Sequence, residues 1–471
     1  MRADRARGAG LSAALGIARE SLRGGRAWVV GGAVRDRLLG RAVVDLDVAV
    51  EGDPRTAARR LAVTAGGPAF QLSGEFGAWR VHAPDRAWQI DVTPLQGDSI
   101  EADLGKRDFT VNAIAEPLDG GALIDPHDGA GDLERRCLRM VSEQAFDDDP
   151  LRVLRLARLA SGLGFEAEDA TVAAAIARAP RIAEVAQERV FGELKQLVAS
   201  DRALEGLALM AQLGVTEHVL PELSTLRGVE QNRFHHLDVH DHTLAVLQAA
   251  MDLERDPAAI LGADHGEAVR TFLAEPFADD LTRGEALRFG ALLHDAGKPA
   301  TRDLTPEGRV TFIGHDTAGA RLSREALTRL RASERLRAHV AALAQHHLRL
   351  GFLVHRRPLD RRTIHRYLVA CSPVEVDVTL LSVADRLATR GDNAEPAIAA
   401  HLEVAHEVLA AAIAWRTEGR RDPLVRGDDL AAALGIEPGP RLGELLAAID
   451  EAAYAGEITT REEAIELART L

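Results

Sequence analysis

The stretch that decides the fold of the N-terminal part reads VVGGAVRD at residues 29–36, and DLD follows it at residues 45–47. An apolar run that leads into two glycines predicts a β-strand, a tight turn and then a helix. Glycine lets a backbone approach a ligand closely, and the free N–H groups of such a turn suit phosphate oxygens. We therefore expect Gly31, Gly32 and Arg35, which lies one turn into the helix, to contact a triphosphate.

The DLD segment places two carboxylates two residues apart on an apolar strand, so Asp45 and Asp47 point to the same face. Neighbouring carboxylates repel each other, and a hard cation such as Mg²⁺ relieves that repulsion. Bound Mg²⁺ can activate a 3′-hydroxyl and stabilise a departing pyrophosphate. Asp91, in QIDV at residues 89–92, is a candidate third carboxylate. The alternative interpretation is a glycine turn followed by solvated acidic strand ends.

The sequence predicts an α+β protein that begins with a small mixed α/β head. Short apolar runs between Gly- and Asp-rich turns indicate strands at residues 27–30, 43–50, 79–82 and 88–92. Leucines at 151, 154, 159 and 163 then recur at helical spacing, and helical patterns continue to the C-terminus. We predict a head at 1–136, an all-α neck at 137–224, a His-rich helical domain at 225–400 and a helical tail at 401–471. Connectors are expected at 221–232 and 417–423.

The ordered motifs of the N-terminal part resemble the CCA-adding enzyme and poly(A) polymerase family, a branch of the polymerase-β-like nucleotidyltransferases. The resemblance rests on the segments at 31–47, on KRDFTVNA at 106–113, on DDDPLRVLRLAR at 147–158, and on matches at 188–194 and 426–461. The chain departs from the family pattern at Lys106, where an arginine is usual, and at Asp148, where a glutamate is more common. The resemblance implies nucleotide addition to a tRNA 3′ end, with CTP and, as an open alternative, ATP.

The neck motif has a chemistry of its own. Asp149 and Arg152 are three residues apart and so are neighbours on a helix, where they offer acceptors and donors to the Watson–Crick edge of a base. Arg155 and Arg158 continue the same stripe and could bind phosphate; an ordinary salt-bridged helix face is the alternative. The full nucleotide-binding set that we predict is Gly31, Gly32, Arg35, Arg107, Asn112, Asp149, Arg152, Arg155 and Arg158.

The histidines gather in the third predicted domain. A His-Asp pair after the apolar run ALL, with a later Asp, resembles the HD phosphohydrolase superfamily signature, and the further histidines resemble its binuclear subset. Imidazole and carboxylate ligands suit a transition metal or Mg²⁺, which makes hydroxide for attack on a phosphoester. Lys298 steadies a phosphate or caps a helix. The predicted metal ligands are His242, His294, Asp295, His315, His346, His347 and Asp385.

The charge balance restricts where RNA can bind. With 57 basic and 72 acidic residues the chain has a net charge of −15, so an RNA site must be a local basic surface. The segment at 355–366 provides the best one, with Arg356, Arg357, Arg361 and Arg362 as candidate contacts; a solvated helix face is equally consistent. We predict a cytoplasmic protein without a membrane span. The two cysteines, Cys137 and Cys371, indicate a reducing compartment, the N-terminal residues lack the apolar core of a secretory signal, and no long apolar window is present.

The sequence leaves competing functions open. Poly(A) polymerase is the nearest rival, followed by an HD nucleotide hydrolase with an inactive head and by a non-catalytic RNA-binding protein. In full CCA-adding enzymes, the resemblance implies, a flexible loop before the segment at 106–113 helps the base-reading pair switch from cytosine to adenine. Here only Gln96–Gly105 lies there, and part of it is expected to form a helix capped by Ser99. We therefore predict a CC-adding enzyme, with drift in loop length as the alternative. The HD metal and the oligomeric state stay open.

Overall fold

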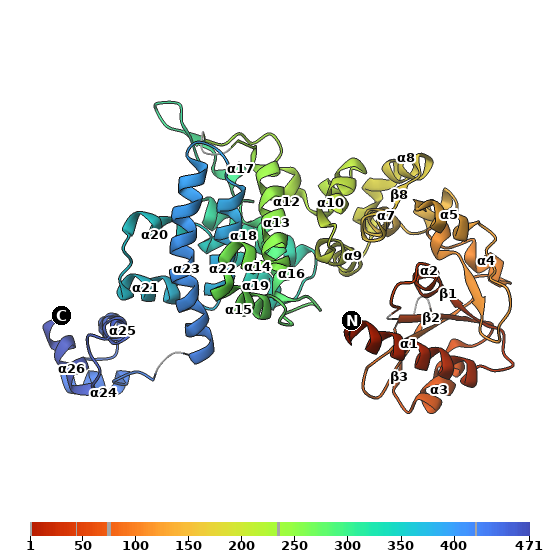
Figure 1. The fold of residues 1–471 in the computed structure, drawn as a ribbon, viewed down its shortest axis with the longest axis horizontal. Coiled ribbons are helices and arrows are strands. Elements are labelled where there is room, and N and C mark those ends of the chain that lie inside the picture. Colours follow the sequence, from red (N-terminus) through yellow and green to blue (C-terminus); the bar gives the residue numbers. More distant parts are fainter. Residues whose placement is uncertain (1, 44, 73–76, 233–235, 420–421) are drawn as a thin grey trace. The chain divides into compact units, whose positions relative to one another are not determined.

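The computed structural model describes residues 2–43, 45–72, 77–232, 236–419 and 422–471. The chain forms two compact units, one of residues 1–186 with 205–218 and one of residues 187–204 with 219–471. Each unit is described by itself below. The predicted α+β class is confirmed, since a mixed sheet near the N-terminus is followed by helices (Figure 1).

The first unit contains a six-stranded mixed sheet with the order β3-β4-β5-β2-β1-β6. Strands β2 and β5 run parallel, and the other neighbours in this sheet are antiparallel. The strands of this sheet are β1 (Ala27–Val30), β2 (Asp45–Val50), β3 (Ala69–Gln71), β4 (Trp79–His82), β5 (Gln89–Pro94) and β6 (Ala115–Pro117). Shorter strands form two-stranded pairs, namely β7 (Cys137–Leu138) with β8 (Glu166–Ala167) and β9 (Asp303–Leu304) with β10 (Val310–Thr311).

Helices pack around the sheet, and after β8 the rest of the chain is almost entirely helical. Up to residue 224 the α-helices are α1 (Arg2–Ser21), α2 (Gly32–Leu38), α3 (Pro54–Ala65), α4 (Ile100–Leu104), α5 (Gly129–Arg135), α6 (Gln144–Asp148), α7 (Leu151–Leu163), α8 (Asp169–Arg178), α9 (Gln187–Ala199), α10 (Ala203–Gln212), α11 (Thr216–Val219) and α12 (Pro221–Ser224). The 3₁₀ helices there are η1 (Thr110–Asn112) and η2 (Ala179–Glu184).

The remaining helices belong to the second unit. They are α13 (Val239–Arg255), α14 (Pro257–Leu261), α15 (Ala263–Leu273), α16 (Arg283–Leu293), α17 (Lys298–Thr301), α18 (His315–Arg329), α19 (Glu334–His346), α20 (Arg349–Leu353), η3 (Val354–Arg356), α21 (Arg361–Cys371), α22 (Glu375–Ala388), α23 (Ala394–Glu418), α24 (Gly427–Leu434), α25 (Pro440–Ala455) and α26 (Arg461–Thr470). Helices α13, α16, α19 and α22 pack on one another and bury apolar side chains together with polar and charged ones, among them His242, Arg283 and Asp377.

The two faces of the head sheet have different roles. Helices α1 and α3 pack together on one face (Figure 1). On the other face, Trp28 and Ala49 pack with Ile100 and Leu104 of α4. Because side chains alternate along a strand, Asp45 and Asp47 share the face of Ala49. The sheet therefore presents both carboxylates on its α4 side.

The local predictions largely agree with the structure. Strands lie at all four predicted places, although β2 starts at Asp45, and Ser99 caps α4 by accepting a hydrogen bond from the Ala102 N–H at 3.2 Å. The sequence pattern did not indicate β3 or β6, which are only three residues long, nor α1, whose alanines and arginines show no clear periodicity. The predicted connector at 221–232 begins with the short helix α12.

One helix bears on the expectation of no long apolar window and no membrane span. Among the described residues, α23 is long and apolar enough to cross a membrane by length and composition, and the bent pair α21 and α22 passes only if taken as one span. Alanine contributes modest hydropathy at each position, and a helix of 25 residues accumulates it. A 39% share of the apolar window of α23 is buried, and the helix packs against α20, α21 and α22.

A buried histidine of the second unit predicts acid sensitivity. Burial lowers the pKa of His339 to about 3, so the folded state keeps the ring neutral while the unfolded chain takes up a proton below about pH 6.5. Its contribution to stability is present above that pH and is lost as the pH falls toward 3. We expect the metal-free protein to lose about 2 kcal/mol from this group between about pH 7 and pH 5. Urea unfolding of His339→Leu should show a correspondingly flatter pH dependence; an unchanged dependence contradicts the assignment.

Candidate active sites

The head site begins with the pairing of two parallel strands. In the register of β2 and β5, Asp47 lies directly beside Asp91, so the two carboxylates face the same side of the sheet. Arg80 of the neighbouring strand β4 donates to both oxygens of Asp91, with N···O distances of 2.7 Å each. The structure thus brings Asp45, Asp47 and Asp91 together, as the sequence predicts.

The electrostatics of this carboxylate group favour a bound cation. Burial and the neighbouring Asp91 raise the pKa of Asp47 to about 6. The same two causes raise the pKa of Asp45. A divalent ion reverses this tendency, because it stabilises the ionised form of each carboxylate. Two aspartates on one strand face and a third beside them are hard oxygen ligands, and they fit Mg²⁺.

The glycine turn lies against this group. Gly31 has φ of +71°, and a side chain there would bring a Cβ to 3.1 Å from Arg107 Nη1 and 3.5 Å from Asp47 Oδ2. Glycine is therefore required at this position by its backbone angle and by its neighbours. Arg107 is oriented by Asp103, whose Oδ2 accepts from Arg107 Nε and Nη2 at 3.1 and 2.9 Å.

A chain of polar contacts connects the glycine turn to helix α7. Arg35 donates to both oxygens of Asp36 and, through Nη1, to Asn112 Oδ1 at 2.7 Å. Asn112 Nδ2 donates to Asp108 Oδ1 at 3.0 Å, and Arg155 donates to Asp108 Oδ2 through Nε and Nη2 at 2.9 and 2.7 Å. Burial disfavours the charge of Asp108, but Arg155 and Asn112 hold the pKa of its carboxyl well below its usual range.

This chain of contacts includes two arginines with predicted roles. The guanidinium groups of Arg35 and Arg155, predicted to bind phosphate, are both engaged by side chains of the protein. They link α2, η1 and α7, and their binding of phosphate stays a prediction. Asn112, predicted to contact nucleotide, is a member of the same chain of contacts.

The predicted base-reading pair lies at the start of α7. Arg152 donates to three main-chain oxygens, those of Lys106 at 2.8 Å, Ala145 at 3.1 Å and Arg107 at 3.3 Å. The Asp149 main-chain carbonyl accepts from the Arg152 N–H at 3.0 Å. The guanidinium of Arg152 is therefore fixed by the segment that leads out of α4. Arg158 is half-buried on the same side of α7.

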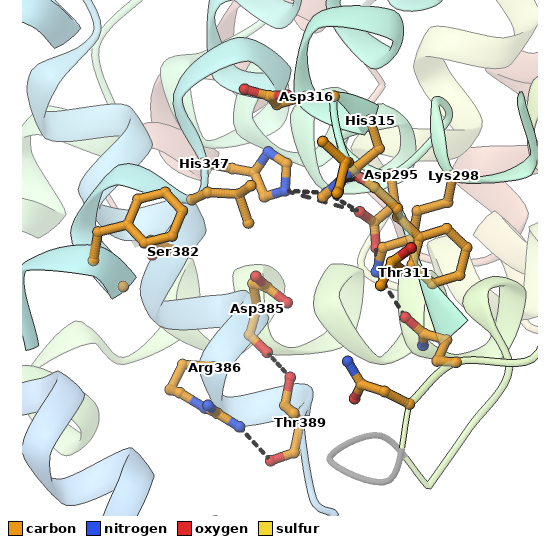
Figure 2. A pocket seen from close by; sticks show the side chains of 18 of the residues that line it. Asp295, Lys298, Thr311, His315, Asp316, His347, Ser382, Asp385, Arg386 and Thr389 are labelled. Carbon is orange, nitrogen blue, oxygen red and sulfur yellow. Dashed lines mark hydrogen bonds and ion pairs between the residues drawn. The ribbon is translucent and has the colours of Figure 1, made fainter. Parts of the chain in front are cut away.

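The second site is a cluster of buried histidines and aspartates (Figure 2). His242 comes from α13, His294 and Asp295 from the end of α16, His315 from the start of α18 and His347 from the end of α19. Asp295 belongs to two groups whose ligand atoms lie within 4.8 Å of one another, one with His242 and His294 and one with His315 and His347.

The rings in this cluster are oriented for coordination through Nε2. The Nδ1 atoms of His294, His315 and His347 lie 2.7–2.8 Å from main-chain oxygens three residues earlier. An Nδ1–H donor leaves Nε2 with its lone pair free for a metal. The Nε2 of His294 and both oxygens of Asp295 are buried without a well-formed hydrogen bond among the described residues. This donor set fits two metal ions that share Asp295.

Charge in the cluster also suits a bridging carboxylate. Burial disfavours ionisation, but His294 and Lys298 hold the pKa of Asp295 well below its usual range. Lys298 Nζ lies 2.6 Å from Asp295 Oδ2, which supports an electrostatic role for this lysine. Asp385 on α22 completes the group, with its Oδ1 2.9 Å from His242 Nε2.

His346 is the one predicted ligand that the structure leaves outside the cluster. Its Nδ1 accepts a hydrogen bond from Arg349 Nε at 2.9 Å. His347, the next residue, is buried and points into the cluster. Two consecutive residues at a helix end point in different directions, so only one of them can face the site.

The candidate RNA-binding arginines are partly occupied. Arg362 pairs with Glu451 and Glu457 of the C-terminal region, and Arg357 pairs with Glu403. Arg361 lies over the ring of Tyr454, with Cζ 5.4 Å from the centroid. Arg362 therefore attaches α21 to α25, which reduces the positive charge that the segment can offer to RNA. No ion pair is described for Arg356, which is exposed.

Three residues that shape the head site carry no strong sequence signal. Arg80 lies in a short strand without a motif. Asp103, within α4, accepts hydrogen bonds from the Gln96 N–H and from Arg107. Asp108 stands inside a quoted motif, but its partner Arg155 is far away in sequence. For Arg80, the available signal was a single arginine on a short strand.

Three strand carboxylates beside a glycine turn, connected to a helix that carries an Asp and Arg pair, define a nucleotidyltransferase head, and the second cluster defines an HD-type metal site. Family models agree with this class. "Poly A polymerase head domain" matches residues 27–99 and 75–139, "Probable RNA and SrmB- binding site of polymerase A" matches 164–226, and "HD domain" matches 239–390. A tRNA nucleotidyltransferase domain 2 model matches residues 400–468.

Similar proteins cover nearly the whole chain. The A-adding tRNA nucleotidyltransferase of Deinococcus radiodurans is 39% identical over 93% of this chain and 93% of its own length. The CC-adding tRNA nucleotidyltransferase of Thermus thermophilus is 36% identical over 93% and 92%. The solved CCA-adding enzyme of Bacillus stearothermophilus has a TM-score of 0.64 at 24% identity and covers 98% of each chain. The chain belongs to the tRNA nucleotidyltransferase family.

The strand carboxylates predict a separable loss of nucleotide addition. Replacing Asp45 or Asp47 by alanine removes one of the oxygen ligands that hold the cation. We expect nucleotide addition to fall by about 10²–10³-fold or more, measured with radiolabelled nucleotide and a tRNA acceptor. The HD cluster lies on other elements, so metal content there should not change. Near-normal addition by either variant contradicts the head assignment.

The contrast between two adjacent histidines gives a second prediction. His347→Ala removes a ligand of the cluster, so we expect the purified protein to bind less Mn²⁺ or Ni²⁺, as measured by plasma mass spectrometry. His346→Ala serves as the matched control and should keep the metal content of the unmodified protein. Equal losses in the two variants would contradict the ligand assignment.

Proposed function

We propose that this enzyme transfers nucleotides from a nucleoside triphosphate to the 3′ end of tRNA, with Asp45, Asp47 and Asp91 as the carboxylates that hold Mg²⁺. The observation that carries this proposal is the Asp47–Asp91 pair beside the glycine turn. When bound, Mg²⁺ supplies charge stabilisation to the attacking hydroxyl and the leaving pyrophosphate. Main-chain N–H groups at Gly31 and Gly32 orient the phosphates, since no side chain obstructs their approach.

Asp149 and Arg152 are proposed to recognise the base in place of a template strand. Arg152 keeps one orientation because three main-chain oxygens hold it, two of them from Lys106 and Arg107. A fixed donor favours one base edge over another, and a mobile one would accommodate two. The rigidity of Arg152 therefore supports selection of a single kind of nucleotide.

The segment before Lys106 is too short and too well held to reorient Arg152. Only Leu95–Ser99 lies between β5 and α4, and Asp103 accepts from the Gln96 N–H at 2.9 Å while it also binds Arg107. This arrangement leaves no flexible loop at the place where the family resemblance implies one. We propose CTP as the nucleotide and a CC end as the product, as the sequence predicts.

A-addition is the second candidate function, because the A-adding relative is 39% identical and the CC-adding relative 36% identical over similar lengths. A fixed Arg152 is compatible with either single specificity. It disfavours sequential addition of both bases. Poly(A) polymerase would need repeated addition of AMP, and an inactive head would not need the intact carboxylate group.

The nucleotide prediction is tested with a tRNA transcript that lacks all three terminal nucleotides. With CTP and ATP together, we expect products that stop after two cytidines, resolved on a sequencing gel. A transcript that already ends in CC, given ATP alone, is the control and should not be extended. Extension of that control identifies an A-adding enzyme, and complete CCA addition overturns the single-nucleotide proposal. Arg152→Ala should raise the use of other nucleotides relative to the preferred one.

The second unit is proposed to be a metal-dependent phosphohydrolase. The ligands His242, His294, Asp295, His315, His347 and Asp385 fit a transition metal or Mg²⁺, which supplies a hydroxide when bound. Asp295 is positioned to join the two ligand groups. Phosphoesters such as 2′,3′-cyclic nucleotides are the proposed substrates.

We also propose domain boundaries, tRNA contacts and a cellular location. A division into head 1–136, neck 137–224, HD domain 225–400 and tail 401–471 is supported by the order of the matched family models. Arg356 and Arg361 are retained as tRNA contacts, since Arg357 and Arg362 are engaged by glutamates. A cytoplasmic location is proposed from the two free cysteines.

A further inference from the structure

Four charged side chains form a row across one face of the head sheet. In the strand pairing, Arg80 of β4 lies opposite Asp91 of β5, and Asp91 lies opposite Asp47 of β2. Directly opposed residues of neighbouring strands point to the same face, so these three side chains share the face of the proposed Mg²⁺ site. Beyond β2, Arg107 Nη1 and Asp47 Oδ2 both approach Gly31. The row therefore reads arginine, aspartate, aspartate, arginine.

Each arginine of the row is bound to a carboxylate, but the two carboxylates differ in kind. Arg107 donates to Asp103 of α4, which is not a proposed metal ligand. Arg80 donates through Nε and Nη2 to Asp91, one bond to each carboxylate oxygen, at 2.7 Å each. We call this two-bond contact the Arg80 fork. The bonds to Asp91 raise the pKa of Arg80, so its guanidinium stays charged.

The Arg80 fork restricts how Asp91 can bind a metal ion. An ionised carboxylate offers about four lone-pair positions, and two parallel N–H donors take one position on each oxygen. One acceptor position then remains on each oxygen of Asp91. The terminal torsion of an aspartate is broad, so a carboxylate without such a partner samples a range of orientations. The fork approaches from β4, on the side of β5 opposite to β2, and fixes the carboxylate in one orientation beside Asp47.

We propose that Arg80 is a positioning residue for nucleotide transfer, because its fork fixes the Asp91 carboxylate in the orientation that a cation shared with Asp47 requires. Arg80 acts through Asp91 and touches neither the nucleotide nor the cation. Removal of a group that hydrogen-bonds a metal ligand lowers metal affinity or activity by about 10–100-fold, which sets the size of the expected effect. The inference rests on the proposed function of the head and assigns a further residue to it.

Two other roles for Arg80 predict different results. A guanidinium that competes with the cation for Asp91 would weaken metal binding, and its removal would then increase the affinity for the metal. A contact that only links β4 to β5 would change the stability of the protein and leave the affinity of the folded protein for metal unchanged. Metal affinity, measured separately from stability, therefore distinguishes the three roles.

The first measurement is the Mg²⁺ requirement of the full-length protein. Nucleotide addition is followed over a range of Mg²⁺ concentrations with the acceptor that the protein extends, either a transcript without the three terminal nucleotides and CTP, or one that ends in CC and ATP. Arg80→Ala should raise the Mg²⁺ concentration for half-maximal rate by about 10–100-fold. At saturating Mg²⁺ the KM for the nucleotide should stay unchanged, because Arg80 does not touch it. A lower Mg²⁺ requirement, or an unchanged one, overturns the proposal.

Direct metal binding provides a readout that is independent of activity. Mn²⁺ replaces Mg²⁺, and the free ion is measured by electron paramagnetic resonance in full-length protein that carries His294→Ala and His347→Ala to deplete the HD cluster. Binding that disappears in Asp47→Asn is assigned to the head. Arg80→Ala should raise the Kd of that site for Mn²⁺ by about 10–100-fold. Arg80→Lys keeps the charge but replaces the planar fork by a point donor, so it should recover only part of the affinity. Tighter binding by Arg80→Ala, or full recovery by Arg80→Lys, overturns the proposal.

Arg55→Ala is the matched control for loss of an arginine beside the same strand. Arg55 is exposed, and its Cζ lies 5.7 Å from the ring centroid of Trp79, the residue before Arg80 on β4. This variant should keep the Mg²⁺ requirement of the unmodified protein. Thermal unfolding of each variant measures the fraction that is folded. A loss of addition by Arg80→Ala that follows the loss of folded protein at every Mg²⁺ concentration assigns Arg80 to stability and overturns the proposal.

The Asp47→Ala variant distinguishes failure of this inference from failure of the proposed function. If Asp47→Ala keeps near-normal addition, the proposed function of the head fails and the inference fails with it. If Asp47→Ala loses addition while Arg80→Ala has the Mg²⁺ requirement of the unmodified protein, the proposed function stands and the inference fails. If Asp47→Ala loses addition and Arg80→Ala needs more Mg²⁺, both stand.

Discussion

The lateral pairing of Asp47 with Asp91 on parallel strands is the interaction on which the head depends. Burial and the neighbouring Asp91 disfavour the ionised form of Asp47, and its pKa rises to about 6. Arg107 and Arg80 lower the pKa of Asp47 but do not outweigh burial and Asp91, since Arg80 is bound to Asp91 and Arg107 is bound to Asp103. The excess of negative charge comes from the positions of the aspartates on the strands, and a divalent cation is the group that would balance it.

Buried carboxylates in this protein fall into two kinds according to how they are paired. Asp108 receives two donors from Arg155, one from Asn112 and one from the Phe109 N–H, so it joins elements and has no capacity left for a ligand. Asp295 is equally buried, yet among the described residues its oxygens lack well-formed hydrogen bonds: Oδ2 lies 2.6 Å from Lys298 Nζ, and the carboxylate faces four imidazoles. A satisfied carboxylate stabilises the fold, and an unsatisfied one creates a site.

The proposed nucleotide choice rests on how tightly Arg152 is held. Its three acceptors are main-chain oxygens, which a side-chain substitution cannot easily move. Two of them follow directly on α4, whose N-cap Ser99 and internal contact from Asp103 to the Gln96 N–H leave little freedom. The short connection from β5 to α4 thus limits how far Arg152 can move, because it restrains the main-chain oxygens that hold this side chain. The proposed specificity therefore depends on chain length as well as on residue type.

The sequence by itself determined the features that depend on residues a few positions apart. These include the strand and glycine turn at Gly31, the shared face of Asp45 and Asp47, and the cap at Ser99. Only the tertiary structure decided which of the predicted polar residues remain available. Arg155 meets Asp108 from 47 residues away, and Arg362 meets Glu457 from 95 residues away. Sequence patterns specify local geometry, whereas pairing between distant side chains depends on how whole elements pack.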